Sequence, residues 1–131
     1  MPISDVIIPD GFQETYDRWQ YAAATRAGDF LFISGVIGVS KDGVCPEDPA
    51  EQFTCAFEDI QRTLKVAGGS LADIVEITSY HLDWLHTRDA FVATKAKYIM
   101  EPYPAWTAIG VAQLGLPAAL VEIRVTAWLG K

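Results

Sequence analysis

The stretch from Asp48 to Gly69 has the start, the repeat and the end of an amphipathic helix. Asp48 suits the N-cap and Pro49 suits the first helical position, where a missing N–H leaves no hydrogen bond unmade. Gly68-Gly69 supplies the stop. Between them apolar residues recur at three- and four-residue intervals and form one stripe: Phe53, Ala56, Phe57, Ile60 and Leu64. The rest of the chain must therefore provide an apolar surface that covers this stripe.

Short apolar, aromatic and β-branched runs on both sides of this helix predict strands that provide the surface. Gly28-Asp29 reads as a tight turn between the first two strands. A second helix is expected to be capped by Thr87, to carry Phe91, Lys95 and Tyr98 on one face, and to end before Pro102. The expected strands are residues 21–27, 30–33 with 36–39 as an extension, 74–82, 106–112 and 120–128.

The resulting order, β-β-α-β-α-β-β, predicts an α+β fold in which two helices pack on one face of a mixed sheet. At 131 residues the chain is expected to form a single domain, residues 1–131. Two helices cover only one face of such a sheet. The other face would carry Tyr21, Phe32 and Trp128, so a homo-oligomer is expected to bury them.

Charge and composition exclude several classes of protein. The net charge is −7, with 10 basic residues against 17 acidic ones, which argues against a nucleic-acid-binding surface. No apolar run is long enough to span a membrane, and the N-terminus lacks the features of a secretory signal. Cys45 and Cys55 fit no zinc or disulfide pattern, so both are expected to be free thiols in a reducing cytoplasm.

The last predicted strand carries the clearest candidates for chemistry. Its odd positions are branched aliphatics, whereas Glu122, Arg124 and Thr126 alternate with them and project from one face. One interpretation is a half-solvated strand with an ion pair on its polar face. The other is a carboxylate in a partly desolvated cleft, where its pKa rises and it can transfer protons.

Other segments offer weaker signals. Ser34-Gly35 ends an apolar strand, and a glycine there either makes a plain turn or lets a ligand approach the backbone. Trp106 follows a rigid Pro-containing turn and suits either a core or a pocket wall. His81 and His86 are five positions apart without a third ligand, so no metal site is expected.

Taken together and in order, these pieces resemble the RidA/YjgF family, and within it the YjgH-like branch. The resemblance covers residues 21 to 127, which is most of the chain. Its matching segments are GDFLFISG at 28–35, VAG at 66–68, DIVEIT at 73–78, PA at 104–105 and VEI at 121–123. The resemblance implies a two-layer fold similar to chorismate mutase and a homotrimer with a central barrel and clefts between subunits.

The same resemblance implies an activity without a metal or an organic cofactor. Members of the family hydrolyse reactive enamines and imines that pyridoxal-phosphate enzymes release, giving a keto acid and ammonia. By position, Glu122 matches the glutamate that activates water, Tyr21 matches a cleft tyrosine, and Ser34-Gly35 matches a serine-glycine pair.

Three positions depart from the family pattern. Trp106, followed by Thr107, stands where an arginine binds the substrate carboxylate; Val36 replaces a common glutamine; and Lys95 lies near a common asparagine. Losing a charge-assisted bidentate contact costs about 2–5 kcal/mol of binding unless another group replaces it. Lys95 or Arg124 could supply the cation, or the ligand is neutral or cationic and contacts the indole and Glu122.

Three functions follow, in order of support. The first is a small-molecule hydrolase or deaminase with altered specificity, in which Glu122 activates water and Tyr21 and Ser34 complete the cleft. The second is a non-catalytic protein that binds a small-molecule metabolite in the intersubunit cleft beside Trp106. The third is an endoribonuclease or translation inhibitor, which the charge of −7 disfavours.

Overall fold

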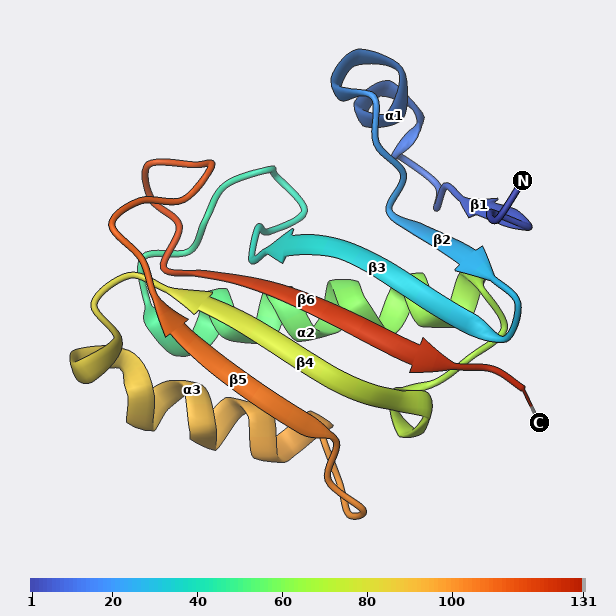
Figure 1. Cartoon of the computed structure of the whole chain (residues 1–131). Helices are drawn as coiled ribbons and strands as arrows, with labels where there is room; N and C mark the ends of the chain where they lie inside the picture. Colours follow the sequence, from blue (N-terminus) through green and yellow to red (C-terminus); the bar gives the residue numbers. More distant parts are fainter. Residues whose placement is uncertain (131) are drawn as a thin grey trace.

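The structure, a computed structural model that describes residues 1–130, contains one six-stranded sheet. The strands are ordered β1-β2-β3-β6-β4-β5 across it, and α2 and α3 lie together on one face (Figure 1). The elements are β1 (Asp5–Ile7), α1 (Gln13–Trp19), β2 (Ala24–Ala27), β3 (Phe30–Ile37), α2 (Pro49–Val66), a 3-10 turn η1 (Leu71–Asp73), β4 (Ile74–His81), α3 (Trp84–Tyr98), β5 (Ala105–Gly110) and β6 (Val121–Trp128).

The sheet is mixed because β4 and β5 pair in parallel while every other neighbouring pair is antiparallel. From β2 onward the elements follow the predicted order β-β-α-β-α-β-β. The prediction of two helices was incomplete, because β1 and α1 precede this core. α1 has only seven residues and buries none of them, so it lacks the apolar stripe by which a helix is recognised in a sequence.

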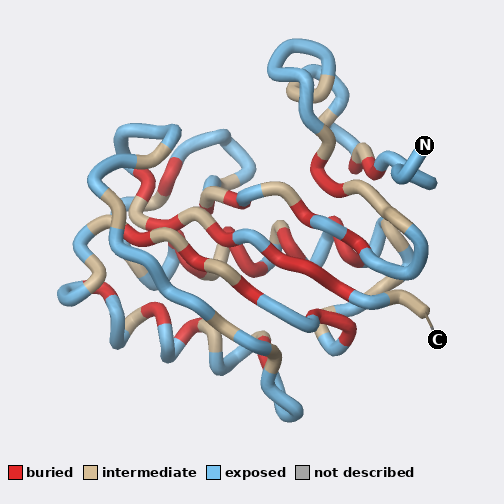
Figure 2. The backbone as a smooth tube through the Cα atoms, viewed as in Figure 1, coloured by how far each residue is buried: buried red, intermediate tan, exposed pale blue. Residues whose placement is uncertain are grey.

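The central helix confirms its sequence signals. The Asp48 carboxylate accepts a hydrogen bond of 3.1 Å from the backbone N–H of Glu51, and Pro49 opens the helix. The stripe that was predicted to be apolar is fully buried against the sheet, with Phe53, Ile60 and Leu64 at zero exposure. Buried residues accordingly gather along the central strands and on the sides of α2 and α3 that face them (Figure 2).

The largest differences from the predicted boundaries are at the starts of α3 and β2, and the strands predicted to end at residues 39 and 112 end at Ile37 and Gly110. α3 begins at Trp84 rather than after Thr87, because Asp83 in a left-handed conformation (φ 52°) precedes it. Thr87 lies inside the first turn, and its hydroxyl donates to the carbonyl of Asp83. The strand predicted at residues 21–27 is β2, which covers only Ala24–Ala27. Tyr21 therefore lies in the connection between α1 and β2.

A β-bulge interrupts the pairing of β3 with β6. Ile33 pairs with Val125 and Val36 pairs with Ile123, so two residues of β3, Ser34 and Gly35, stand opposite one residue of β6. Ladder pairing is lost at this point. Ser34-Gly35 therefore ends one regular stretch of strand and begins another, which places it beside the cavity described below.

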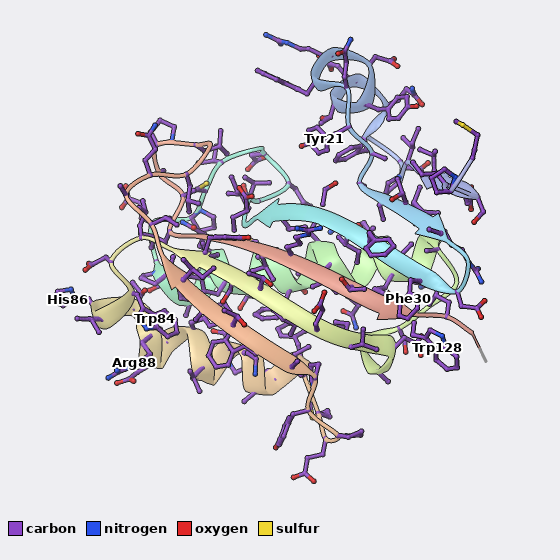
Figure 3. The ribbon with its side chains drawn as sticks, in the orientation of Figure 1. Tyr21, Phe30, Trp84, His86, Arg88 and Trp128 are labelled. Atoms are coloured by element: carbon purple, nitrogen blue, oxygen red, sulfur yellow. The ribbon has the colours of Figure 1, made fainter. Side chains whose placement is uncertain are left out.

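The face of the sheet opposite α2 and α3 carries exposed aromatic side chains. Phe30 pairs with Trp128 across β3 and β6, and both lie at the same end of the sheet (Figure 3). Phe32 lies beside Phe30 on the same face, and each of these three side chains is about 40% exposed. The prediction of an uncovered aromatic face is confirmed for Phe32 and Trp128. None of the helices within residues 1–130 is long and apolar enough to cross a membrane.

Candidate functional site

A cavity of about 840 Å³ lies between the N-terminal segment, the bulge in β3, α2 and the start of β6. Four of the residues that the sequence nominated line it: Tyr21, Ser34, Gly35 and Glu122. They come from three separate segments of the chain, and the pairing of β3 with β6 is what brings the last three together.

Glu122 lies directly against Gly35. A Cβ atom placed on Gly35 would lie 2.3 Å from Oε2 of Glu122, so only glycine leaves room for this carboxylate. Glu122 is partly buried, and within residues 1–130 its carboxylate forms no hydrogen bond or ion pair. Both oxygens are thus free to accept protons or hydrogen bonds from a ligand or a water molecule in the cavity.

Tyr21 lies between α1 and the sheet (Figure 3), where its ring packs edge-on against Phe12 at a centroid distance of 5.6 Å. Burial raises the pKa of its phenol, and the nearby carboxylates of Glu122 and Asp59 raise the pKa further. The phenol therefore keeps its proton at neutral pH and can donate it in a hydrogen bond.

The hydroxyl proton of Ser34 already takes part in a hydrogen bond. Its Oγ donates a 2.7 Å hydrogen bond to the carbonyl of Ala22, and its backbone N–H donates to the carbonyl of Ala23. These bonds tie the segment before β2 to the bulge. They leave only the lone pairs of Oγ for a ligand, so Ser34 can act as an acceptor but not as a nucleophile without rearrangement.

Sequence reasoning missed the charged wall that α2 contributes. Asp59 and Arg62 form an i,i+3 ion pair on this helix and line the cavity. Burial raises the pKa of Asp59, and the guanidinium of Arg62 opposes that rise. The i,i+3 spacing was visible in the sequence, but nothing there indicated that this side of α2 faces Glu122.

Lys95 and Trp106 lie elsewhere, in contact with each other. Trp106 lies on β5, separated from β3 by β6 and β4, and its side chain faces α3. Lys95 Nζ lies 4.5 Å from the centroid of the indole, a cation–π contact, and burial lowers the pKa of this lysine. Neither residue lines the cavity of Tyr21 and Glu122 within one chain.

Two buried polar side chains, Ser79 and His81, form a hydrogen-bonded chain that begins at the indole of Trp106. Trp106 Nε1 donates a 2.9 Å hydrogen bond to Ser79 Oγ, which lies 2.7 Å from Nε2 of His81. Ser79 Oγ therefore bridges the indole of Trp106 and the imidazole of His81. Burial lowers the pKa of His81 to about 4, so the ring is neutral at physiological pH. Nδ1 has no hydrogen-bond partner among residues 1–130.

Arg124 and Thr107 project from the sheet face that lacks helices. Both are exposed, and neither lines the cavity. The ion pair considered for the polar face of β6 does not form between Arg124 and Glu122. Thr126 instead donates to the carboxylate of Glu76 on β4, at 3.0 Å.

The two histidines are unrelated in space and in environment. His81 is fully buried, whereas His86 is exposed at the start of α3 and pairs with Asp83 (Figure 3). In the part of the chain that the structure describes, no three His, Cys, Asp or Glu side chains gather in a way that could hold a metal ion. Cys45 and Cys55 are both free.

The fold recurs in known proteins. Residues 13–129 match the family model described as Endoribonuclease L-PSP. The chain is 37% identical over 109 residues to the RutC family protein YjgH of Escherichia coli, covering 82% of this chain and 83% of that one. A solved structure of protein YjgH superposes with a TM-score of 0.88 at 33% identity, covering 100% and 99% of the two chains.

A second relative carries an activity in its name. The 3-aminoacrylate deaminase RutC of Acinetobacter baylyi is 32% identical over 127 residues, covering 94% of this chain and 96% of that protein. RidA from a Psychrobacter species has the same fold, with a TM-score of 0.80 at 27% identity, covering 98% of each chain. The chain therefore belongs to the RidA/YjgF family, which is also called the Endoribonuclease L-PSP family. Within that family it is YjgH-like, as the sequence predicted.

Proposed function

We propose that the protein is a small-molecule hydrolase that deaminates an imine or enamine, with Glu122 as the group that activates water. The observation that carries this proposal is the Glu122 carboxylate, which lies unpaired against Gly35 in a cavity that Tyr21 and Ser34 also line. The deaminase named among the relatives supports the same reaction class.

The reaction requires one water molecule and one proton shuttle. Glu122 takes a proton from water as the water oxygen bonds to the imine carbon, and the C=N π electrons move to nitrogen. Glu122 returns the proton to that nitrogen, which gives a carbinolamine. Glu122 then takes the proton of the new hydroxyl group and passes it to the nitrogen, the oxygen electrons form the C=O bond as the C–N bond breaks, and ammonia leaves a carbonyl product. Such a general base contributes about 10²- to 10⁴-fold to the rate. The Tyr21 phenol can hydrogen-bond the oxygen or nitrogen that gains charge.

We further propose that the protein is a homotrimer in which a neighbouring copy completes each cleft. Within one chain Lys95 and Trp106 lie at the opposite side of the sheet from Tyr21 and Glu122, so the two groups can meet only across a subunit interface. The exposed aromatic face of Phe30, Phe32 and Trp128 supports such an assembly and the central barrel expected of it.

In that arrangement Lys95 is a better substitute for the missing arginine than Arg124 is. The indole of Trp106 orients the Lys95 ammonium, whereas no residue of the described chain pairs with Arg124. Lys95 would then serve a substrate carboxylate where the substrate has one. Trp106 itself cannot, because its only donor is bonded to Ser79.

The test is deamination of 2-iminopropionate, or of the true substrate once known, by Glu122→Gln. We expect turnover to fall by about a hundredfold or more while the fold and assembly are retained. Glu47→Gln, an exposed glutamate outside the cavity, is the matched control and should keep wild-type activity. Unchanged turnover in Glu122→Gln would remove Glu122 from the mechanism.

Mixed assemblies test whether the cleft is shared. If Glu122→Gln and Lys95→Ala are each inactive, unfolding and refolding them together should restore about a quarter of the sites, because each site takes one group from each neighbour. No recovery in confirmed mixed trimers would place both groups in one subunit or outside the mechanism.

Experiments can distinguish two other functions from the proposed hydrolase. A binding protein without catalysis, suggested by Trp106 in place of the arginine, would stabilise the fold with a metabolite that is recovered unchanged. Ribonuclease activity would be RNA cleavage that survives stringent repurification and is lost in Glu122→Gln. The carboxylates that line the cavity disfavour this second reading, because a polyanion would be repelled. The free cysteines support action in the cytoplasm.

A further inference from the structure

The charges that line the cavity are unbalanced. Three carboxylates line it, Asp10, Asp59 and Glu122, against one guanidinium, that of Arg62. Arg62 is already paired with Asp59 through an Nη1–Oδ1 contact. Within residues 1–130, Asp10 and Glu122 have no ion-pair partner. Within one chain, an anion that enters from solvent would therefore meet a net negative wall and a single guanidinium that is already paired.

The uncharged part of the wall is aromatic. Phe12, Trp19 and Tyr21 all line the cavity, and Phe12 and Tyr21 are locked edge to face. Trp19 is 66% exposed and already carries one cation, because the Arg18 guanidinium lies 5.3 Å from the centroid of its ring. Aromatic faces next to carboxylates are the usual surroundings of ammonium and related cations in proteins.

The raised pKa of Tyr21 is consistent with this arrangement of charges. Its phenol responds to both Glu122 and Asp59, so the two carboxylates, one from β6 and one from α2, act on the same volume. Burial raises its pKa most, and the two carboxylates raise it further because they repel a negative phenolate. The same two carboxylates would repel a ligand carboxylate and attract a cation.

From the carboxylates, the aromatic rings and the volume, we infer that this cavity selects a cationic ligand, an ammonium or protonated imine carried on an apolar or aromatic body. This substrate class rests on the proposed function, since it concerns the same cavity, and it makes a substrate carboxylate dispensable. A protonated imine is also the form that water attacks more readily, and Glu122 would lie beside both the cation and the attacking water.

Three probes with the same ring and similar length test the inference: 2-phenylethylammonium, 2-phenylethanol and 3-phenylpropionate. Binding is measured by calorimetry on the full-length protein at neutral pH and low salt. We expect the ammonium to bind about tenfold tighter than the alcohol and the carboxylate to bind most weakly. Equal or tighter binding of the carboxylate would overturn the inference.

Variants locate the effect. Glu122→Gln and Asp59→Asn should each reduce the preference for the ammonium over the alcohol by about fivefold, while the affinity for the alcohol stays the same. The exposed Glu47→Gln is the control and should keep the full preference. A preference that survives both cavity variants would contradict the inference, and two variants guard against a failure of one to fold.

The outcomes separate this inference from the proposed function. Preferential ammonium binding without turnover of any imine would leave the substrate class standing and remove the hydrolase. Turnover of an imine that 2-phenylethylammonium does not inhibit, while 3-phenylpropionate does, would leave the hydrolase standing and remove the cationic class.

Discussion

The cavity of Tyr21 and Glu122 and the cluster around Trp106 differ in how their polar groups are used. In the cavity, Glu122 is unpaired and its neighbour Gly35 leaves it space. In the cluster, Trp106, Ser79 and His81 bond to one another, and aromatic rings surround them. Buried polar groups that bond to one another stabilise a fold, whereas an unpaired carboxylate in a cavity is available for a ligand. The proposed function therefore assigns chemistry to the first region and mainly packing to the second.

Phe91 offers the largest test of this contrast. Its ring is fully buried and contacts Phe53, His81 and Trp106 among others, joining α2, α3, β4 and β5. We expect Phe91→Ala to lower the free energy of unfolding by about 3–5 kcal/mol, measured by urea denaturation. Tyr21→Phe, in the cavity, should change it by less than about 0.5 kcal/mol. Similar losses in both variants would end the distinction between the two regions.

Acid should weaken the cluster through His81. Its folded-state pKa of about 4 is below the ordinary value of 6.5, so the unfolded chain takes up the proton first as the pH falls. The stabilisation is complete above pH 6.5 and is lost progressively down to pH 4, a difference of about 3 kcal/mol.

NMR can test this prediction directly. Titration of the histidine ring protons should show His81 unprotonated until well below pH 6. A His81 ring that titrates near pH 6.5 in the folded protein would show that it is not desolvated.

Ser79→Ala should have a smaller effect. The substitution removes the acceptor of the Trp106 indole and the partner of His81, leaving two buried polar groups unsatisfied. We expect a loss of about 1–3 kcal/mol in the free energy of unfolding, with a change in tryptophan emission as the indole loosens. Ser40→Ala, on a partly exposed loop serine, is the control. An unaltered emission spectrum would mean that Ser79 does not position Trp106.

Lys95→Met tests a residue that packs in the Trp106 cluster and that the proposed function also assigns to a neighbouring cleft. The variant keeps the aliphatic length but loses the cation over Trp106, so stability should fall by only about 0.5–1 kcal/mol. If Lys95 binds substrate in a neighbouring subunit's cleft, turnover of a carboxylate-bearing imine should fall by a much larger factor than so small a loss of stability would cause. Equal, small effects on both would make Lys95 a packing residue.

The sequence predicted those parts of the fold that depend on local patterns. Helix α2 was correct at both ends because its cap, its stripe and its glycine stop are written within one segment. The start of α3 was not, since Asp83 adopts a left-handed conformation that a non-glycine residue rarely signals. α1 escaped because it buries no residue.

The site was predicted only in part for a related reason. Position in the family pattern nominated Tyr21, Ser34, Gly35 and Glu122, and these residues share one cavity. Asp59 and Arg62 were not nominated, because their place in the cavity depends on how α2 is rotated against β3 and β6, which no local pattern encodes. Trp106 faces α3 rather than this cavity, an orientation set by the bond to Ser79 on the adjacent strand.

The bulge at Ser34-Gly35 also acts as a change of parity within one strand. Before it the core takes the odd residues Leu31 and Ile33; after it the core takes the even residue Val36. The extra residue of the bulge therefore lets both Ile33 and Val36 point into the core although three positions separate them. A deletion of one residue here would restore regular alternation and keep Val36 inward opposite Ile123, so the packing of β3 could survive a change that removes Ser34 or Gly35 from the cavity.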